Sequence, residues 1–242
     1  MGIITLNKVD ALWWLGRYTE RVFTTLKTFL PYYDTCLDHD PQRFRAFSEA
    51  LDLDADVDDF AQFLDGFLYD AKTPNSVCHA MNAAFDNAVT LRPEVGTQTL
   101  GYIEIAINHL RTSREAAERI SALRSACDAL LAFWGSLEDS TSTPEVKAFV
   151  MAGKYVERLD LYSRFKRPER DFSAPVIRLG FNMQILPPRA HKLLSPAIVG
   201  AADVLAARGY GAALVERVRA IAPEPCLDED GNVVSATTAV DA

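Results

Sequence analysis

Residues 14–22, WLGRYTERV, return in a related form at residues 151–159, MAGKYVERL, and this repeat decides the fold. Both copies read G-[RK]-Y-x-E-R-[VL], with four identities and two conservative matches in seven positions. The first copy lies in a stretch, about residues 7–33, whose apolar residues recur at three- and four-residue steps. The second lies in a stretch, about residues 143–165, that opens with the cap-and-proline signal Thr-Pro-Glu. We therefore expect two long helices belonging to pseudo-equivalent helical units.

Turn residues and cap signals divide the rest of the chain into further helical segments, with no convincing strand pattern. Asn7 is expected to cap the first helix, and Pro31 to bend or fray its end. A cap at Thr73-Pro74 predicts a helix to about Leu91, and a capping box of Thr112 and Glu115 predicts one to near Gly135. Pro187, Pro188 and Pro196 mark an irregular connection. The other expected helices are Gln42–Leu51, Val57–Tyr69, Thr97–Leu110, Pro196–Arg208 and Ala212–Ile221. The fold class is therefore all-α: a single-domain bundle of about eight to ten helices over residues 1–221.

Composition agrees with a globular protein that fills its own core. The chain has 242 residues, of which 49% are hydrophobic and 24% charged. The longest uninterrupted apolar run, residues 129–134, is far shorter than the ~20 residues that span a bilayer. The opening residues MGIITLNK lack the features of a signal peptide. We expect a cytoplasmic protein that does not enter a membrane.

Charge and cysteine usage exclude several classes of partner and cofactor. The net charge is −8, and residues 222–242, which hold five acidic and no basic side chains, are expected to form a mobile acidic tail. Neither part has the basic excess of a nucleic-acid binder. The four cysteines are scattered singly, as expected of reduced thiols, and no set of residues has convincing metal-ligand spacing. No phosphate-binding or dinucleotide motif occurs, so no cofactor is expected.

The repeated motif is the one candidate functional feature. Each copy places a glycine and a glutamate four residues apart on one helix face, Gly16 with Glu20 and Gly153 with Glu157. A glycine in mid-helix usually marks the close approach of another backbone or of a ligand. Each glutamate is flanked by two cations, which with the motif tyrosines complete the candidate site: Arg17, Tyr18 and Arg21 in the first copy, and Lys154, Tyr155 and Arg158 in the second.

Three interpretations of these charges remain open. If the two helices pack together, Glu20 can pair with Arg158 and Glu157 with Arg21, because a buried carboxylate requires a partner. Alternatively, Glu20 and Glu157 face a ligand or a partner's peptide in a polar pocket. The third interpretation is ordinary surface charge. We expect the helices that carry Gly16 and Gly153 to lie next to each other.

The motif resembles that of a known bacterial family. The run from Leu6 to Arg21, which ends in Leu-Trp-Trp-Leu-Gly-Arg-Tyr-Thr-Glu-Arg, resembles the opening of the alpha-E family, also called DUF403. The second copy, with Asp160 added, resembles that family's later G-R-x-x-E-R-A-D segment. Members are all-helical, and they are typically encoded or fused with a circularly permuted ATP-grasp amidoligase. The resemblance implies a role in peptide synthesis or modification.

The likeness covers about residues 6–165 and is strong only in the two motifs. Val22-Phe23 stands where the family usually has Ala-Glu, and residues 86–89, Asp-Asn-Ala-Val, stand for its E-N-A-R run. Nothing after about Pro168 resembles the family's second half, so the chain reads as a divergent or shortened member.

Three functions follow from these observations. The first is an accessory or scaffold protein of an ATP-grasp-type peptide ligase, with a circularly permuted ATP-grasp protein as its partner. The second is an enzyme that uses Glu20 and Glu157 as an acid/base pair in a cleft between the two helical units. The third is an oligomerisation module, and self-association is left open in each case. An accessory protein leaves its motif helices packed and paired, whereas an enzyme needs an unpaired carboxylate in a cleft.

Overall fold

The computed structural model describes residues 6–38, 44–53, 59–141 and 143–222. Within these ranges every regular element is helical, as predicted, and there are eleven α-helices where about eight to ten were expected. They are α1 (Leu6–Asp38), α2 (Phe44–Ala50), α3 (Phe60–Leu64), α4 (Val77–Thr90), α5 (Arg92–Val95), α6 (Thr97–Thr112), α7 (Arg119–Ser140), α8 (Pro144–Arg164), α9 (Ser173–Ile185), α10 (Pro188–Ala207) and α11 (Ala212–Arg219). Of the expected acidic tail, residues 223–242 lie outside the described residues.

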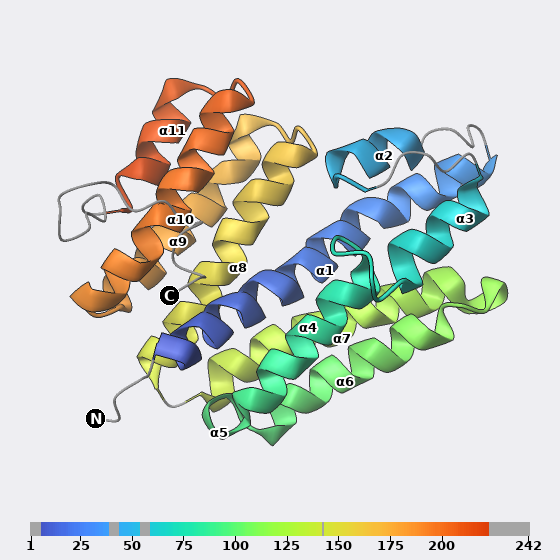
Figure 1. Ribbon diagram of the computed structural model, residues 1–242, viewed down its shortest axis with the longest axis horizontal. Coiled ribbons are helices and arrows are strands. Elements are labelled where there is room, and N and C mark those ends of the chain that lie inside the picture. The colour runs from blue at the N-terminus through green and yellow to red at the C-terminus, as the bar shows by residue number, and fades with distance from the viewer. Residues whose placement is uncertain (1–5, 39–43, 54–58, 142, 223–242) are drawn as a thin grey trace.

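The two motif helices form the centre of the bundle. Helix α1 runs diagonally through the molecule and packs along α8, α4 and α7 (Figure 1). Helix α6 packs on α7 and α4, so these three helices cover one side of α1. Helices α9 and α10 pack on α8, and α11 packs on α10. The pair α1 and α8 therefore joins two groups of helices that follow each other in the sequence.

Burial explains why these two helices are central. The α1 side chains Leu12, Leu15, Val22 and Leu26 recur at helical spacing and are fully buried. Removing one such leucine from water contributes about 2 kcal/mol. Helix α8 is buried on nearly all sides, since every residue from 149 to 157 is buried. A helix surrounded by protein must supply partners for each polar side chain that it carries, which makes its motif charges decisive for stability.

Two expectations for α1 are wrong. The helix already includes Leu6, so Asn7 lies in its first turn and is not the residue that caps it. The helix also continues through Pro31 to Asp38. Proline removes one helical hydrogen bond at a cost of ~3 kcal/mol, which packing can offset. Beside Pro31, the Phe29 ring contacts Phe47 and Phe67 at centroid distances of 5.4 and 5.0 Å, and this aromatic cluster holds the helix in place.

Two predicted caps are also wrong because other groups use their hydroxyls. The Thr73 hydroxyl donates to the Asp70 carboxylate (2.7 Å), and α4 begins only at Val77, where the Ser76 side chain accepts from the His79 amide (3.0 Å). The Thr112 hydroxyl donates to a carbonyl of its own helix α6, so no capping box forms and α7 begins later, at Arg119. The apolar spacing therefore predicts that these helices exist, but not where they begin, because Ser, Thr and Asp side chains can bond to nearby groups in turns as well as at helix caps.

The largest discrepancies occur after α8. Helix α9 is not among the expected helices. The irregular connection expected at Pro187, Pro188 and Pro196 is wrong, because Pro188 and Pro196 both lie in α10. Pro196 does not begin a helix but lies inside α10, which begins at Pro188. There the Ser195 hydroxyl bonds the His191 carbonyl (2.6 Å) within the same helix. Among the described residues, α10 is also the one helix that is long and apolar enough to cross a bilayer. The core helix of a soluble protein can have the same length and composition, so this is weak evidence for a membrane span.

Between the predicted and observed boundaries of the other helices the differences are small. The helix expected over Val57–Tyr69 is α3 followed by a π-helical turn over Asp65–Tyr69, and residues 54–58 are not described. The helix expected to end near Gly135 continues to Ser140. The helix from the Thr-Pro-Glu signal begins at Pro144 and ends at Arg164, as predicted.

Candidate functional site

The two motif glycines lie where α1 and α8 cross. A Cβ atom added to Gly16 would lie 1.9 Å from the Val150 carbonyl oxygen, and one added to Gly153 would lie 2.2 Å from the Trp13 carbonyl oxygen. Each contacted carbonyl belongs to the residue three positions before the opposing glycine, so the two contacts are reciprocal. The prediction that the motif helices are neighbours is therefore confirmed, and both glycines mark backbone contact between helices.

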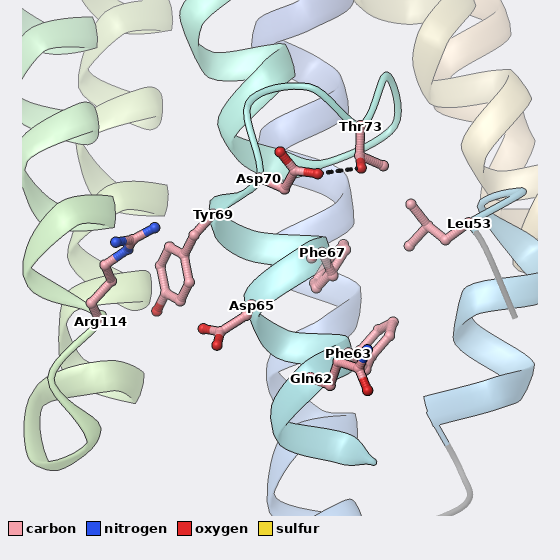
Figure 2. Close-up of a pocket in the computed structure, with 10 residues that line it drawn as sticks. Leu53, Gln62, Phe63, Asp65, Phe67, Tyr69, Asp70, Thr73 and Arg114 are labelled. Carbon is pink, nitrogen blue, oxygen red and sulfur yellow. Dashed lines mark hydrogen bonds between the residues drawn. The ribbon is translucent and has the colours of Figure 1, made fainter. Parts of the chain in front are cut away.

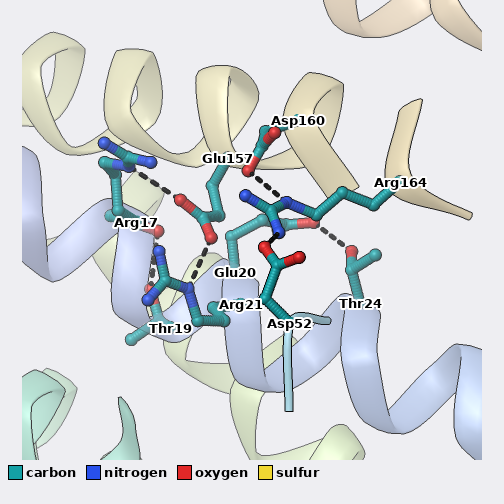
Figure 3. A network of polar contacts seen from close by, with 10 residues as sticks. Arg17, Thr19, Glu20, Arg21, Thr24, Asp52, Glu157, Asp160 and Arg164 are labelled. Carbon is teal, nitrogen blue, oxygen red and sulfur yellow. Dashed lines mark hydrogen bonds and ion pairs between the residues drawn. The ribbon is translucent and has the colours of Figure 1, made fainter. Parts of the chain in front are cut away.

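One turn beyond the glycines, Glu157 lies at the centre of a charge network (Figure 3). Its carboxylate has no solvent exposure and accepts from Arg17 Nε (2.7 Å, to Oε2) and Arg21 Nε (2.6 Å, to Oε1). Burial alone would raise the pKa of Glu157, but the two guanidinium groups outweigh burial and lower it. Glu157 is therefore held in its charged form by α1.

Glu20 makes the mirrored contact from α1 to α8. Its buried carboxylate accepts from Arg158 Nε (2.6 Å, to Oε1) and from Arg158 Nη2 (2.8 Å, to Oε2), a two-pronged pair of the stronger kind. The hydroxyl of Thr24, four residues along α1, also donates to Glu20 Oε1. Sequence reasoning did not identify Thr24, although its spacing from Glu20 places both on one face.

The crossed pairing expected from the sequence is thus confirmed in both halves. Glu20 pairs with Arg158 and Glu157 with Arg21, and the surface-charge interpretation is wrong because both carboxylates are buried. The space beside Glu157 has a volume of about 30 Å³, which accommodates water but no substrate. Farther along α8, Arg164 pairs with Asp160 (3.0 Å) and with Asp52, extending the network toward α2.

The motif aromatics contact the guanidinium groups of the motif arginines. The Arg17 guanidinium lies 4.7 Å from the Trp14 ring centroid, and Trp14 stacks on Tyr18 at 5.1 Å. In the second copy, the Arg158 guanidinium lies 5.6 Å from the Tyr155 ring centroid. Contacts of this kind stabilise a cation by about 0.5–2 kcal/mol and restrict its rotamers. The tyrosines therefore orient the arginines.

Lys154 breaks the symmetry of the repeat. It is the counterpart of Arg17, yet it forms no ion pair with Glu20, and its Nζ lies 3.9 Å from the centroid of the Trp134 ring on α7. The side chain is only 7% exposed. Burial lowers the pKa of Lys154 to about 8, with attraction from Glu20 opposing it and repulsion from Arg158 and Arg178 adding to it. Trp134 and Arg178 belong to this site, but no repeated motif marked them in the sequence.

A further pocket lies away from the motif. It has a volume of about 780 Å³ and lies between the π-helical turn and the loop that carries Arg114 (Figure 2). Some of its polar groups are engaged: Asp70 accepts from Thr73, the Tyr69 hydroxyl donates to the Ser113 carbonyl (2.6 Å), and the Arg114 guanidinium lies 5.0 Å from the Tyr69 ring centroid.

Comparison with known proteins identifies one family. The model of Alpha-E, described as "a predicted alpha-helical domain with a conserved ER motif", matches residues 8–168. That range contains both Glu-Arg pairs and ends just after α8. No curated protein and no solved structure matches the chain.

Proposed function

The chain belongs to the Alpha-E family, and from that premise we propose that it is an accessory or scaffold protein of a bacterial ATP-grasp-type peptide ligase or peptide-modification system. Its partner in this proposal is a circularly permuted ATP-grasp protein, and it acts in the cytoplasm without catalysing a step itself. The partner follows from the family resemblance of the motifs.

The observation that carries the non-catalytic role is the complete pairing of both motif carboxylates. A general acid or base must reach the substrate and change protonation near the working pH. Glu157 meets neither condition, because it is buried between two arginines that lower its pKa. Glu20 is equally buried and accepts three hydrogen bonds from Arg158 and Thr24. The charges of the motif are therefore used to join α1 to α8.

A rigid centre of this kind suits a scaffold. Breaking one partner of a buried pair costs about 3–5 kcal/mol, so the two crossed pairs hold the helix groups on either side in one relative orientation. A scaffold needs that property, since its surfaces must present fixed geometry to a partner. The enzyme alternative, with Glu20 and Glu157 as an acid/base pair, would require a cleft that opens onto them.

Co-purification tests the proposal. The tagged chain is expressed with a circularly permuted ATP-grasp protein from the same genome, and the retained protein is identified after affinity capture and size-exclusion chromatography. We expect a stoichiometric complex, and ligase activity that is lost when the chain is omitted. A chain that elutes alone would refute the proposed partner, and elution as a discrete oligomer would favour the oligomerisation module.

A second measurement separates scaffold from enzyme. The reconstituted system is assayed with Glu157→Gln, with Glu104→Gln as the matched control, because Glu104 is exposed on α6. If the chain is a scaffold, the activity lost in the Glu157→Gln variant should match the fraction of the variant that is unfolded or not bound to the partner. A variant that stays folded and bound but is inactive would establish the enzyme alternative.

A further inference from the structure

We propose that the pocket between α7, α8 and α9 binds a carboxylate that carries an apolar substituent, with Lys154 as the anion contact. The pocket has a volume of about 520 Å³. Its wall from α9 lies beyond the residues that the family model matches, so the site combines a motif lysine with a part of the chain outside that match. The inference does not depend on the proposed ATP-grasp partnership.

The first observation is a buried cation that the fold leaves without a counter-ion. Lys154 lines the pocket and is 93% buried, because its exposed fraction is 7%. In the described part of the chain its Nζ has an aromatic neighbour, Trp134, but no ion pair or hydrogen bond, whereas its counterpart Arg17 bonds Glu157. A largely buried ammonium group without an acceptor in the protein is costly, and a bound anion lowers that cost.

The second observation is that hydrogen-bond donors gather in the same pocket. Arg178 of α9 lines it and donates through Nη1 to the Tyr155 hydroxyl (3.3 Å), which leaves its other N–H groups for a ligand. The Trp134 indole N–H is buried and has no acceptor. The Asn182 Nδ2 group is already used as a donor, since it bonds the Arg178 carbonyl (2.7 Å). The excess of donors over acceptors favours an anion.

The surrounding charges agree with this choice. Four groups act on Lys154: Glu20, Arg158, Arg178 and Glu138. Glu20 is neutralised by Arg158, and Glu138, the carboxylate in the pocket lining, lies at an exposed rim where it pairs with Lys147 (3.3 Å). The inner part of the pocket therefore has a positive potential from Lys154 and Arg178. Burial lowers the pKa of Lys154 to about 8, and repulsion from Arg158 and Arg178 adds to that effect.

The third observation determines the apolar part of the ligand. Ile177 and Phe181 stand four residues apart on α9, line the pocket and are 61% and 64% exposed. Large apolar side chains with this exposure beside a cationic pocket provide contact area for a hydrocarbon group. A free aliphatic acid and the C-terminus of a peptide with an apolar last residue share this chemistry.

Titration calorimetry with the full chain tests the proposal at pH 7. The probes are hexanoate and its neutral isostere hexanamide, together with a pentapeptide ending in leucine, with a free and with an amidated C-terminus. We expect the acid form of at least one pair to bind at least tenfold more tightly than its amide. Binding of hexanoate alone identifies a free acid as the ligand, and binding of the peptide identifies a chain end. Equal affinity for acid and amide in both pairs, or no binding, overturns the proposal.

Variants locate the binding in this pocket. Lys154→Met is expected to reduce affinity at least tenfold, whereas Lys72→Met, a change of the same type at an exposed position, leaves it unchanged. If Lys154→Met does not fold, Phe181→Ala provides the decisive variant, because Phe181 is exposed and its loss does not disturb the core. It should weaken hexanoate severalfold, while Leu193→Ala on α10 has no effect. Unchanged affinity in the Phe181→Ala variant contradicts the proposed site.

The pH dependence provides a further check. Hexanoate stays charged above pH 6, so its affinity should fall as the pH rises from 7 through about 8, where Lys154 loses its proton. An affinity that is constant to pH 9.5 would show that Lys154 is not the anion contact.

Discussion

Replacing Gly16 with alanine perturbs the crossing of α1 and α8 directly. The added Cβ would lie 1.9 Å from the Val150 carbonyl oxygen, and real Cβ contacts are essentially never shorter than 3.0 Å. The helices must therefore separate by about 1.1 Å at this point. The contacts between Glu20 and Arg158, 2.6 and 2.8 Å long, lie one turn away on the same interface. A separation of this size would lengthen both contacts beyond the ~3.2 Å limit of a good hydrogen bond.

The expected loss of stability follows from these two effects. Overpacking of a close contact costs about 1–3 kcal/mol, and weakening of a buried ion pair adds to it. The higher helix propensity of alanine returns up to ~1 kcal/mol. We expect a net loss of about 2–4 kcal/mol in the free energy of unfolding, measured by urea denaturation followed by circular dichroism.

The matched control is Gly101→Ala in α6. No atom lies within 4 Å of a Cβ added to Gly101, so this variant gains helix propensity without a clash. We expect its stability to rise by up to ~1 kcal/mol. A Gly16→Ala variant as stable as the Gly101→Ala variant would refute the conclusion that the motif glycine exists for helix contact.

Three further predictions concern the charges and the end of the chain. The pKa of Glu157 is lowered in the folded state, so the unfolded state binds more protons at pH values below the ordinary value of 4.5. The free energy of unfolding, measured from pH 6 to 3, should therefore fall as the pH drops below 4.5. A flat profile would contradict the ion pairing of Glu157. The pKa of Lys154 is also lowered, from 10.5 to about 8, so the unfolded state again binds more protons between these two pH values. The free energy of unfolding should therefore rise by up to ~3 kcal/mol from pH 8 to 10.5. The Lys154→Met variant should not show this rise. Truncation after Ile221 should leave the thermal midpoint within a degree or two, since residues 222–242 offer almost no apolar surface; a large drop would mean that they dock on the body.

The central part of the fold was accessible from the sequence because it depends on repetition and period. The duplicated G-[RK]-Y-x-E-R-[VL] string placed two helices side by side, and the charge pattern limited the partners of Glu20 and Glu157. The apolar spacing of a helix is read from many residues together, so the prediction of a helix still holds where single positions depart from the pattern.

The errors arise where one local group decides between alternatives. Thr73 has the sequence of a helix cap, but Asp70 binds its hydroxyl and Ser76 caps α4 instead. Pro31 has the sequence of a helix end, but aromatic packing around Phe29 carries α1 through it. Tertiary contacts decide both cases, and no sequence window contains them.

The site was predicted only in part, because part of it depends on contacts between helices that are distant in the sequence. The crossed ion pairs follow from the symmetry of the repeat, whereas the place of Lys154 is a departure from that symmetry. Its neighbour Trp134 comes from α7 and Arg178 from α9, and nothing in the motif connects either one to it. A pocket assembled from three helices requires the fold before it can be recognised.

A double-mutant cycle on Glu20 and Arg158 tests the central claim, that the motif charges hold α1 and α8 together. Glu20→Gln and Arg158→Met should each cost about 3–5 kcal/mol in chemical denaturation, because each leaves a buried partner without compensation. The double variant should cost less than the sum by about 1–3 kcal/mol, because the stranded partner is gone. Additive effects near zero, together with loss of function in the folded Glu20→Gln variant, would contradict the claim and identify the carboxylate as a ligand or catalytic group.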